Sequence, residues 1–171
     1  MESVRPAKGP ESVALRPLAV EDAEAMTAVL ADPSLYKFTG GAPPTSDELA
    51  RRYRAQTRGH SPDGTQTWIN LIVTRGDSPE PIGYVQATLP VGGDGAEIAW
   101  VIGRPWQGRG YARRAVTLLL EELTRRGVHH VTAHIHPHNQ ASNRLAARLG
   151  LKATDTVVDG EIRWTGEVPA P

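Results

Sequence analysis

The chain has 171 residues, 39% of them hydrophobic, which supports one domain with a continuous core. Nineteen Lys and Arg residues balance nineteen Asp and Glu residues, so there is no basic field for nucleic acid, and the lack of cysteine excludes a disulfide scaffold, a thiolate zinc site and a cysteine nucleophile. No apolar run reaches the roughly 20 residues that span a bilayer, and residues 1–6 do not resemble a signal peptide. The sequence therefore predicts a cytoplasmic protein without nucleic-acid or membrane partners, in which a domain at 13–168 lies between flexible tails at 1–12 and 169–171.

The first hundred residues alternate between strand and helix patterns. Residues 13–18 predict a strand, and the acidic pair Glu21 and Asp22 opens a helix that extends to about residue 31. Thr45 and Glu48 have the spacing of a capping box at the start of a second helix, whose thin apolar stripe predicts a surface position. Three strands are then expected, separated by turns rich in Gly, Asp, Ser and Pro, at residues 68–74, 81–89 and 97–102.

After residue 110 the spacing of the apolar residues becomes that of a helix. Apolar residues recur there with the spacing of one buried helical stripe: Ala112, Ala115, Val116, Leu119, Leu120 and Leu123. Gly127 is expected just past the end of this helix. A strand at 128–135, a helix at 139–149 and two strands around Asp159 and Gly160 complete the pattern. The order of elements predicts a mixed α/β sheet with one crossover near its middle.

A glycine turn, Gly108 and Gly110, joins the strand at 97–102 to this helix. Small residues let backbone N–H groups approach an anion, and a helix start adds unpaired N–H donors. Arg113 and Arg114 lie in the first turn, where a cation destabilises a helix unless an anion is bound at its N-terminus. The turn therefore favours a phosphate ligand, although the sequence contains neither the glycine motif of a dinucleotide-binding fold nor that of a P-loop.

Two motifs in this chain resemble those of the GNAT superfamily of N-acetyltransferases. Gln107, Gly110 and Ala112 match the pattern Gln/Arg-x-x-Gly-x-Gly/Ala. The segment 136–151 resembles the Pro-x-Asn-x-Ala-Ser and Leu-Gly-Phe signature of the branch that acetylates ribosomal protein N-termini, with Leu151 in place of Phe, and residues 15–18 also look like that branch. The resemblance implies a single-domain α/β (α+β) GNAT fold with a mixed, mostly antiparallel sheet of six to seven strands, about four helices, and a splayed strand pair at the cofactor site.

The resemblance also implies site residues. In such enzymes acetyl-CoA binds as co-substrate, with its pantetheine arm paired to the strand before the turn. The corresponding cofactor-binding residues here are Trp100, Val101, Ile102, Gln107, Gly108, Arg109, Gly110, Tyr111, Ala112, Arg113 and Asn139. Glu97 is the candidate general base, with a solvent-facing strand residue as the alternative. Ser142 either assists the leaving thiolate or only satisfies a backbone N–H at a helix start, because the tyrosine that many relatives use is Ala146 here.

The predicted function is acetyl transfer from acetyl-CoA to a primary amine, either a protein N-terminus or a small molecule, by a monomer or homodimer. The alternative is a non-catalytic CoA-binding sensor or interaction module. A metal site at the alternating His134, His136 and His138 is also conceivable, but Pro137 interrupts the strand and no carboxylate or thiol partner is evident nearby, so no metal is expected. Residues 37–41 and the last two strands are expected to select the acceptor.

Overall fold

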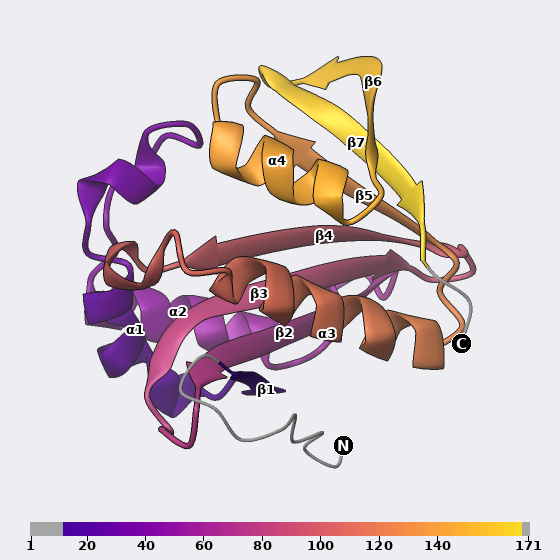
Figure 1. Cartoon of the computed structure of the whole chain (residues 1–171). Coiled ribbons are helices and arrows are strands. Elements are labelled where there is room, and N and C mark those ends of the chain that lie inside the picture. Colours follow the sequence, from indigo (N-terminus) through magenta and orange to yellow (C-terminus); the bar gives the residue numbers. More distant parts are fainter. Residues whose placement is uncertain (1–11, 169–171) are drawn as a thin grey trace.

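The fold is a single seven-stranded sheet with helices on both faces (Figure 1). The computed structural model describes residues 12–168, so residues 1–11 and 169–171, where the tails are predicted, lie outside the described part. The strands are β1 (Val13–Pro17), β2 (Gln66–Arg75), β3 (Pro81–Pro90), β4 (Gly95–Ile102), β5 (His130–Ile135), β6 (Lys152–Val158) and β7 (Glu161–Glu167). Their order is β1-β2-β3-β4-β5-β7-β6, and only β4 and β5 are parallel among the described strands. The predicted mixed, mostly antiparallel sheet is confirmed.

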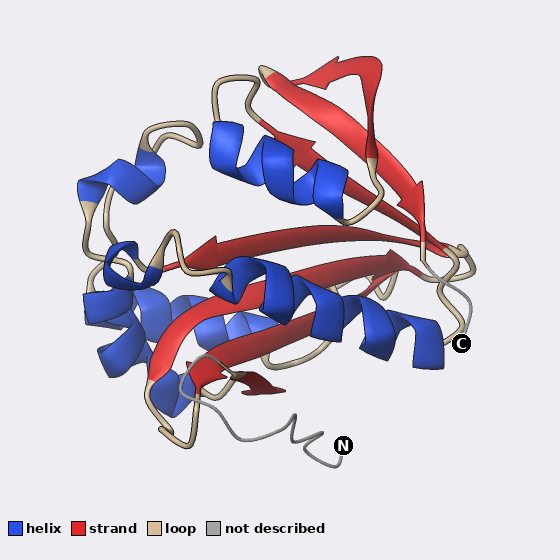
Figure 2. Ribbon diagram, viewed as in Figure 1, coloured by secondary structure: helices blue, strands red, loops and turns tan. Residues whose placement is uncertain are grey.

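Four α-helices form in the described part of the chain: α1 (Ala23–Val29), α2 (Ser46–Gln56), α3 (Tyr111–Arg125) and α4 (Gln140–Arg148). Figure 2 shows α3 and α4 on one face of the sheet and α1 and α2 on the other. Two buried clusters match these faces, a larger one that includes residues of α3 and α4 and a smaller one that includes residues of α1 and α2. No helix of the described residues has both the length and the apolar content to cross a bilayer.

Helix α3 follows the predicted apolar stripe. Ala115, Val116, Leu119 and Leu123 are completely buried, and Leu120 is 8% exposed. Burial of each Val or Leu side chain contributes about 1.5–3 kcal/mol, so the stripe holds the helix firmly against the sheet. Gly127 follows α3 with φ of +78°, as predicted for the residue past its end. The position of α3 in turn fixes the glycine turn that precedes it.

The two helices on the opposite face differ in how they begin. Helix α2 starts with the predicted capping box, in which the Glu48 N–H donates to Thr45 Oγ1 (3.2 Å) and the Thr45 N–H donates to Glu48 Oε2 (3.1 Å). The first helix is shorter than expected, because residues 20–22 form a 3₁₀ turn and α1 ends at Val29. In that turn Asp22 accepts from the Ala19 N–H (2.8 Å) and from both terminal nitrogens of Arg16 (2.7 and 2.9 Å).

Strands β4 and β5 separate after a short paired stretch. Residues 95–97 of β4 pair with residues 130–132 of β5, and no further pairs join the two strands. Beyond this point β4 continues to Ile102 on β3, and β5 continues to Ile135 on β7. The two strands diverge from this junction in Figure 1. The sheet therefore has an opening between the end of β4 and the end of β5, and the splayed pair expected from the resemblance is present.

Candidate functional site

The opening exposes backbone hydrogen-bonding groups of β4. The Gly103 N–H donates to the Ile82 carbonyl (2.8 Å), and the register with β3 runs from Glu97 to Ile102 without a shift. Because alternate residues of an antiparallel strand point their N–H and C=O groups to the same side, those of Trp100 and Ile102 point away from β3, into the opening. Two of the three predicted pantetheine-pairing residues thus offer main-chain partners. Val101 points its backbone to β3 and packs its side chain near α1 and α2.

The glycine turn lies at the end of β4 and leads directly into α3. Gly108 and Gly110 have φ of +76° and +80°, values that L-residues other than Gly rarely adopt. The Gln107 side chain donates from Nε2 to the Ile102 carbonyl (3.0 Å), which ties the turn to the strand. Gly110 caps α3 without a side-chain hydrogen bond, so the N–H groups of the first turn are free to bind an anion.

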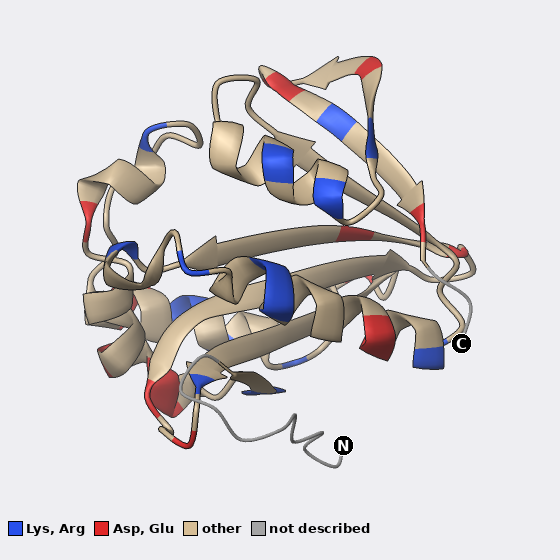
Figure 3. Ribbon diagram, in the orientation of Figure 1, with Lys and Arg blue, Asp and Glu red and all other residues tan. Residues whose placement is uncertain are grey.

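Three arginines surround this turn and all three are exposed: Arg109, Arg113 and Arg114. Figure 3 shows the Lys and Arg segment near the start of α3, while charges of both signs are scattered elsewhere. Helix N-termini carry a partial positive charge, so cations placed there are unfavourable without a negative partner. Arg114 donates to the Arg109 carbonyl (3.2 Å) within the turn. The whole arrangement suits a phosphate group, and the residues predicted to bind a pyrophosphate fit that chemistry.

Glu97 and His134 meet across the junction of β4 and β5. Glu97 Oε1 lies 3.0 Å from His134 Nδ1, and because a carboxylate only accepts, the imidazole N–H donates. The Glu97 side chain is 57% exposed and that of His134 is 21% exposed. Glu97 pairs with Thr88 of β3 and Thr132 of β5, so these side chains share one face of the sheet. A solvent-accessible carboxylate oriented by an imidazole can accept a proton from a bound molecule.

The start of α4 assigns different tasks to Asn139 and Ser142. Asn139 is the N-cap, because its Oδ1 accepts from the Ser142 N–H (3.3 Å). The Ser142 hydroxyl is half-buried and makes no hydrogen bond within residues 12–168, so it does not act as the cap. Ala146 is completely buried in the larger core cluster. The Ser142 hydroxyl therefore remains available as a hydrogen-bond donor, whereas the Asn139 side chain caps α4.

The other two histidines take part in a ring cluster. The ring centroids of Phe38, which lies between α1 and α2, and His136 are 5.2 Å apart, and those of His136 and His138 are also 5.2 Å apart. This cluster joins residues 37–41, expected to contact the acceptor, to the segment between β5 and α4. Within the described residues, no group of three or more His, Asp or Glu side chains is arranged to hold a metal ion.

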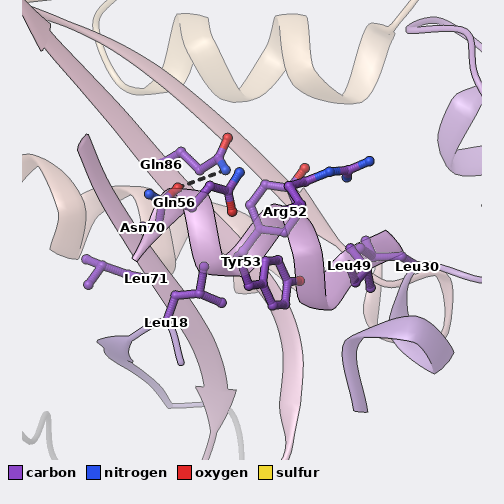
Figure 4. A pocket seen from close by; sticks show the side chains of 10 residues that line it. Leu18, Leu30, Leu49, Arg52, Tyr53, Gln56, Asn70, Leu71 and Gln86 are labelled. Carbon is purple, nitrogen blue, oxygen red and sulfur yellow. Dashed lines mark hydrogen bonds between the residues drawn. The ribbon is translucent and has the colours of Figure 1, made fainter. Parts of the chain in front are cut away.

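A pocket of about 140 Å³ lies on the Glu97 face of the sheet, between α2 and strands β2 and β3. Figure 4 shows the amide side chains of Gln56, Asn70 and Gln86 at one end and Arg52 at the other, with the Gln86 amide donating to Asn70 Oδ1 (2.9 Å). Apolar residues complete the lining: Leu18, Leu30, Leu49 and Leu71, with Tyr53 and Tyr84. Burial raises the pKa of Tyr53 and of Tyr84, so both phenols stay neutral.

Sequence reasoning did not find the Glu97–His134 contact or this pocket. The strand pattern placed both Glu97 and His134 on strands, but the register of a parallel pair has no local signal. The polar residues at alternate positions of β2 and β3, Asn70 and Gln86, are the one signal that could have indicated a polar patch on an otherwise apolar sheet.

Comparisons with known proteins agree with this geometry. The profile of an acetyltransferase (GNAT) domain matches residues 12–152. An uncharacterized N-acetyltransferase, p20 of Bacillus licheniformis, is 28% identical over 153 residues, which cover 88% of this chain and 85% of p20. An uncharacterized N-acetyltransferase of Bacillus subtilis, YycN, is 29% identical over 58 residues, which cover 34% of this chain and 37% of YycN.

Solved structures share the fold at low identity. An aminoglycoside acetyltransferase in complex with coenzyme A, AAC(6')-Ib, superposes with a TM-score of 0.75 at 20% identity and covers 91% of this chain and 95% of its own. A putative ribosomal-protein-serine acetyltransferase from Vibrio cholerae has a TM-score of 0.75 at 16% identity, with coverage of 98% of this chain and 97% of its own. At these identities the likeness establishes the fold.

Proposed function

Because this chain belongs to the GNAT acetyltransferase family, we propose that it transfers the acetyl group of acetyl-CoA to a primary amine, by direct attack within a ternary complex. The amine belongs to a small molecule or to a protein N-terminus. The observation that carries the proposal is the opening between β4 and β5, which leads from unpaired backbone groups directly to the glycine turn and the start of α3.

The residues of the opening fit acetyl-CoA at both of its ends. Trp100 supplies its backbone N–H and C=O for an extended, amide-containing arm, as an added strand would require, and Ile102, whose carbonyl accepts from Gln107, supplies its N–H. The turn from Gln107 to Ala112, with Arg113, supplies backbone N–H groups and positive charge for the pyrophosphate. When bound, acetyl-CoA supplies an activated acetyl thioester. Asn139, between the end of β5 and the start of α4, is the remaining side-chain contact carried over from the family.

Glu97 accepts the proton of the attacking amine, directly or through a water molecule. Its side chain is accessible to solvent, and the His134 N–H donates a hydrogen bond to one of its oxygens, with 3.0 Å between Nδ1 and Oε1. As the N–C bond forms and the C–S bond breaks, the Ser142 hydroxyl donates a hydrogen bond to the departing CoA thiolate, which then takes up a proton from solvent. The Ile102 N–H, which points into the opening, stabilises the negative charge that develops on the acetyl oxygen.

The test is a screen of amines with acetyl-CoA, followed by release of free thiol and by mass spectrometry of the product. Glu97→Gln should lower kcat/KM by about 10²- to 10⁴-fold at neutral pH, and by progressively less in alkali, where the free amine needs no base. Glu121→Gln, an exposed carboxylate on α3, is the matched control. An unchanged pH profile in Glu97→Gln would remove Glu97 as the base. CoA binding without any product would instead favour the non-catalytic CoA-binding module.

A further inference from the structure

Arg52 stands at the pocket between α2 and the sheet without an anionic partner. It lines the pocket with Tyr53 and Tyr84. Burial raises the pKa of both phenols and that of Tyr36, and the positive charge of Arg52 offsets part of this rise. No ion pair or hydrogen bond of the Arg52 guanidinium forms within residues 12–168. Arg52 is an exposed residue at the rim of the pocket, so its guanidinium has five donors available for a bound ligand.

No carboxylate lines this pocket. Its polar lining besides Arg52 consists of the phenols and the amides of Gln56, Asn70 and Gln86. Asp22 is the carboxylate that interacts electrostatically with Tyr53. It forms a bidentate salt bridge with Arg16 and also accepts a hydrogen bond from the Ala19 N–H. The pocket is therefore electropositive at the Arg52 end and uncharged elsewhere.

The pocket lies beside the proposed transfer site on the same face of the sheet. Gln86 and Tyr84 of β3 pair directly with Ala99 and Val101 of β4, and Glu97 is two residues along from Ala99. Ala99 is exposed and carries only a methyl group, so no large side chain of β4 stands between Glu97 and the residue that pairs with Gln86. The distance from β4 to β2 is two strand spacings, about 10 Å. An acceptor that extends from Glu97 to the Asn70 end of the pocket therefore crosses β3.

We propose that the acceptor is an amine that also carries a carboxylate, and that Arg52 binds this carboxylate while the amine lies beside Glu97. The inference rests on the proposed acetyl transfer and adds the chemical class of the acceptor. Arginine matches a carboxylate with two parallel hydrogen bonds, and the amides of the pocket hydrogen-bond the polar atoms between the two ends. A polycationic acceptor would meet Arg52 as a like charge.

The size of the pocket agrees with this class. Pockets for drug-sized ligands enclose roughly 300–1,000 Å³, whereas this one has about 140 Å³. It therefore accommodates one end of a small acceptor.

The experiment compares ω-aminocarboxylates of increasing length with the corresponding ω-aminoamides, diamines and kanamycin. Wild-type protein should react faster with the ω-aminocarboxylates than with the matching ω-aminoamides, with an optimum at one chain length. Arg52→Gln should lower kcat/KM for this acceptor about ten- to hundredfold, mainly through KM, and leave the aminoamide unchanged. Arg52→Glu should favour the diamine. Arg51→Gln, an exposed neighbour on α2 that does not line the pocket, should behave as wild type.

Binding provides a second measurement that does not depend on turnover. Calorimetry of the ω-aminocarboxylate against protein saturated with CoA should show a matching loss of affinity in Arg52→Gln but not in Arg51→Gln, with equal melting temperatures. The inference is overturned if carboxylate and amide acceptors react equally, or if Arg163→Gln, an exposed cation of β7 opposite His134, removes the preference while Arg52→Gln does not. Transfer to amines without a carboxylate preference refutes the inference alone, whereas no transfer to any amine refutes the proposed function.

Discussion

Replacement of Gly83 by alanine tests whether the close approach of β3 and β4 sets the shape of the opening. Gly83 pairs directly with Ile102. A Cβ atom at position 83 would overlap the Val101 carbonyl oxygen and would lie 2.9 Å from Ile102 Cδ1 and 3.0 Å from Ile102 Cα. Carbon atoms pack best at about 3.5–4.0 Å, so the two strands must move apart by about 0.5–1 Å. Two of the three blocking atoms belong to the backbone and cannot rotate away.

The expected cost is that of an overpacked core, about 1–3 kcal/mol of unfolding free energy. For a chain of this size each kcal/mol lowers the melting temperature by about 2–4 °C, so Gly83→Ala should melt about 2–12 °C below wild type. The displaced atoms lie at the positions proposed to hold the thioester. Because a misplacement of about 1 Å can cost about 10²-fold in rate, kcat/KM should fall by about ten- to hundredfold.

Differential scanning calorimetry and steady-state kinetics on the same preparation provide both quantities. Gly93→Ala is the matched control, since Gly93 lies in an exposed turn where an added Cβ meets Pro90 at an acceptable 3.4 Å. If Gly83→Ala melts and turns over as Gly93→Ala does, the contact between β3 and β4 does not determine the geometry of the opening.

Three further outcomes are expected. Acetyl-CoA at a hundred times its Kd should stabilise wild type by about 2.7 kcal/mol, and Gly110→Glu, which places a carboxylate at a φ of +80° in the phosphate turn, should abolish the effect; calorimetric binding equal to wild type would show that the turn is not the phosphate site. Ser142→Ala should keep CoA affinity and melting temperature but lower the single-turnover rate, with a smaller defect for a donor whose thiol has a lower pKa; equal rates with both donors would contradict an acid role. Burial opposes ionisation of Asp22, but hydrogen bonds from Arg16 and Ala19 outweigh it and hold the pKa below 3.8. Asp22→Asn should therefore cost about 1–2 kcal/mol at pH 7, and this difference should shrink as the pH falls from 3.8 through the lower pKa of the folded state; a difference independent of pH would refute the assignment.

The elements with local signals were predictable from the sequence. The apolar stripe from Ala115 to Leu123 has the period of a helix, and the buried side of α3 follows it. The turn at Asp159 and Gly160 has positive φ at both residues, as residue pairs of this kind between two strands indicate. The seven strands and their mixed character followed from such signals together with the resemblance.

The long-range geometry of the site was not predictable in the same way. Glu97 was expected to lie beside the transfer site, but its contact with His134 depends on the register of β4 and β5, which α3 and the rest of the sheet determine together. Ser142 could be a cap or a proton donor on sequence grounds, and only the structure gives the cap to Asn139. The roles of Glu97 and Ser142 stay predictions until the variants are measured.

The short junction of β4 and β5 also leaves two unpaired strand edges inside the sheet. Exposed edges are templates for pairing with another chain, and folded proteins usually cover them with helices, loops or charged residues. Here the edges face each other across the opening that receives the co-substrate in the proposed function. We therefore expect ligand-free protein to associate more readily during purification and storage than protein saturated with CoA, because the bound co-substrate occupies the positions where a foreign strand would pair.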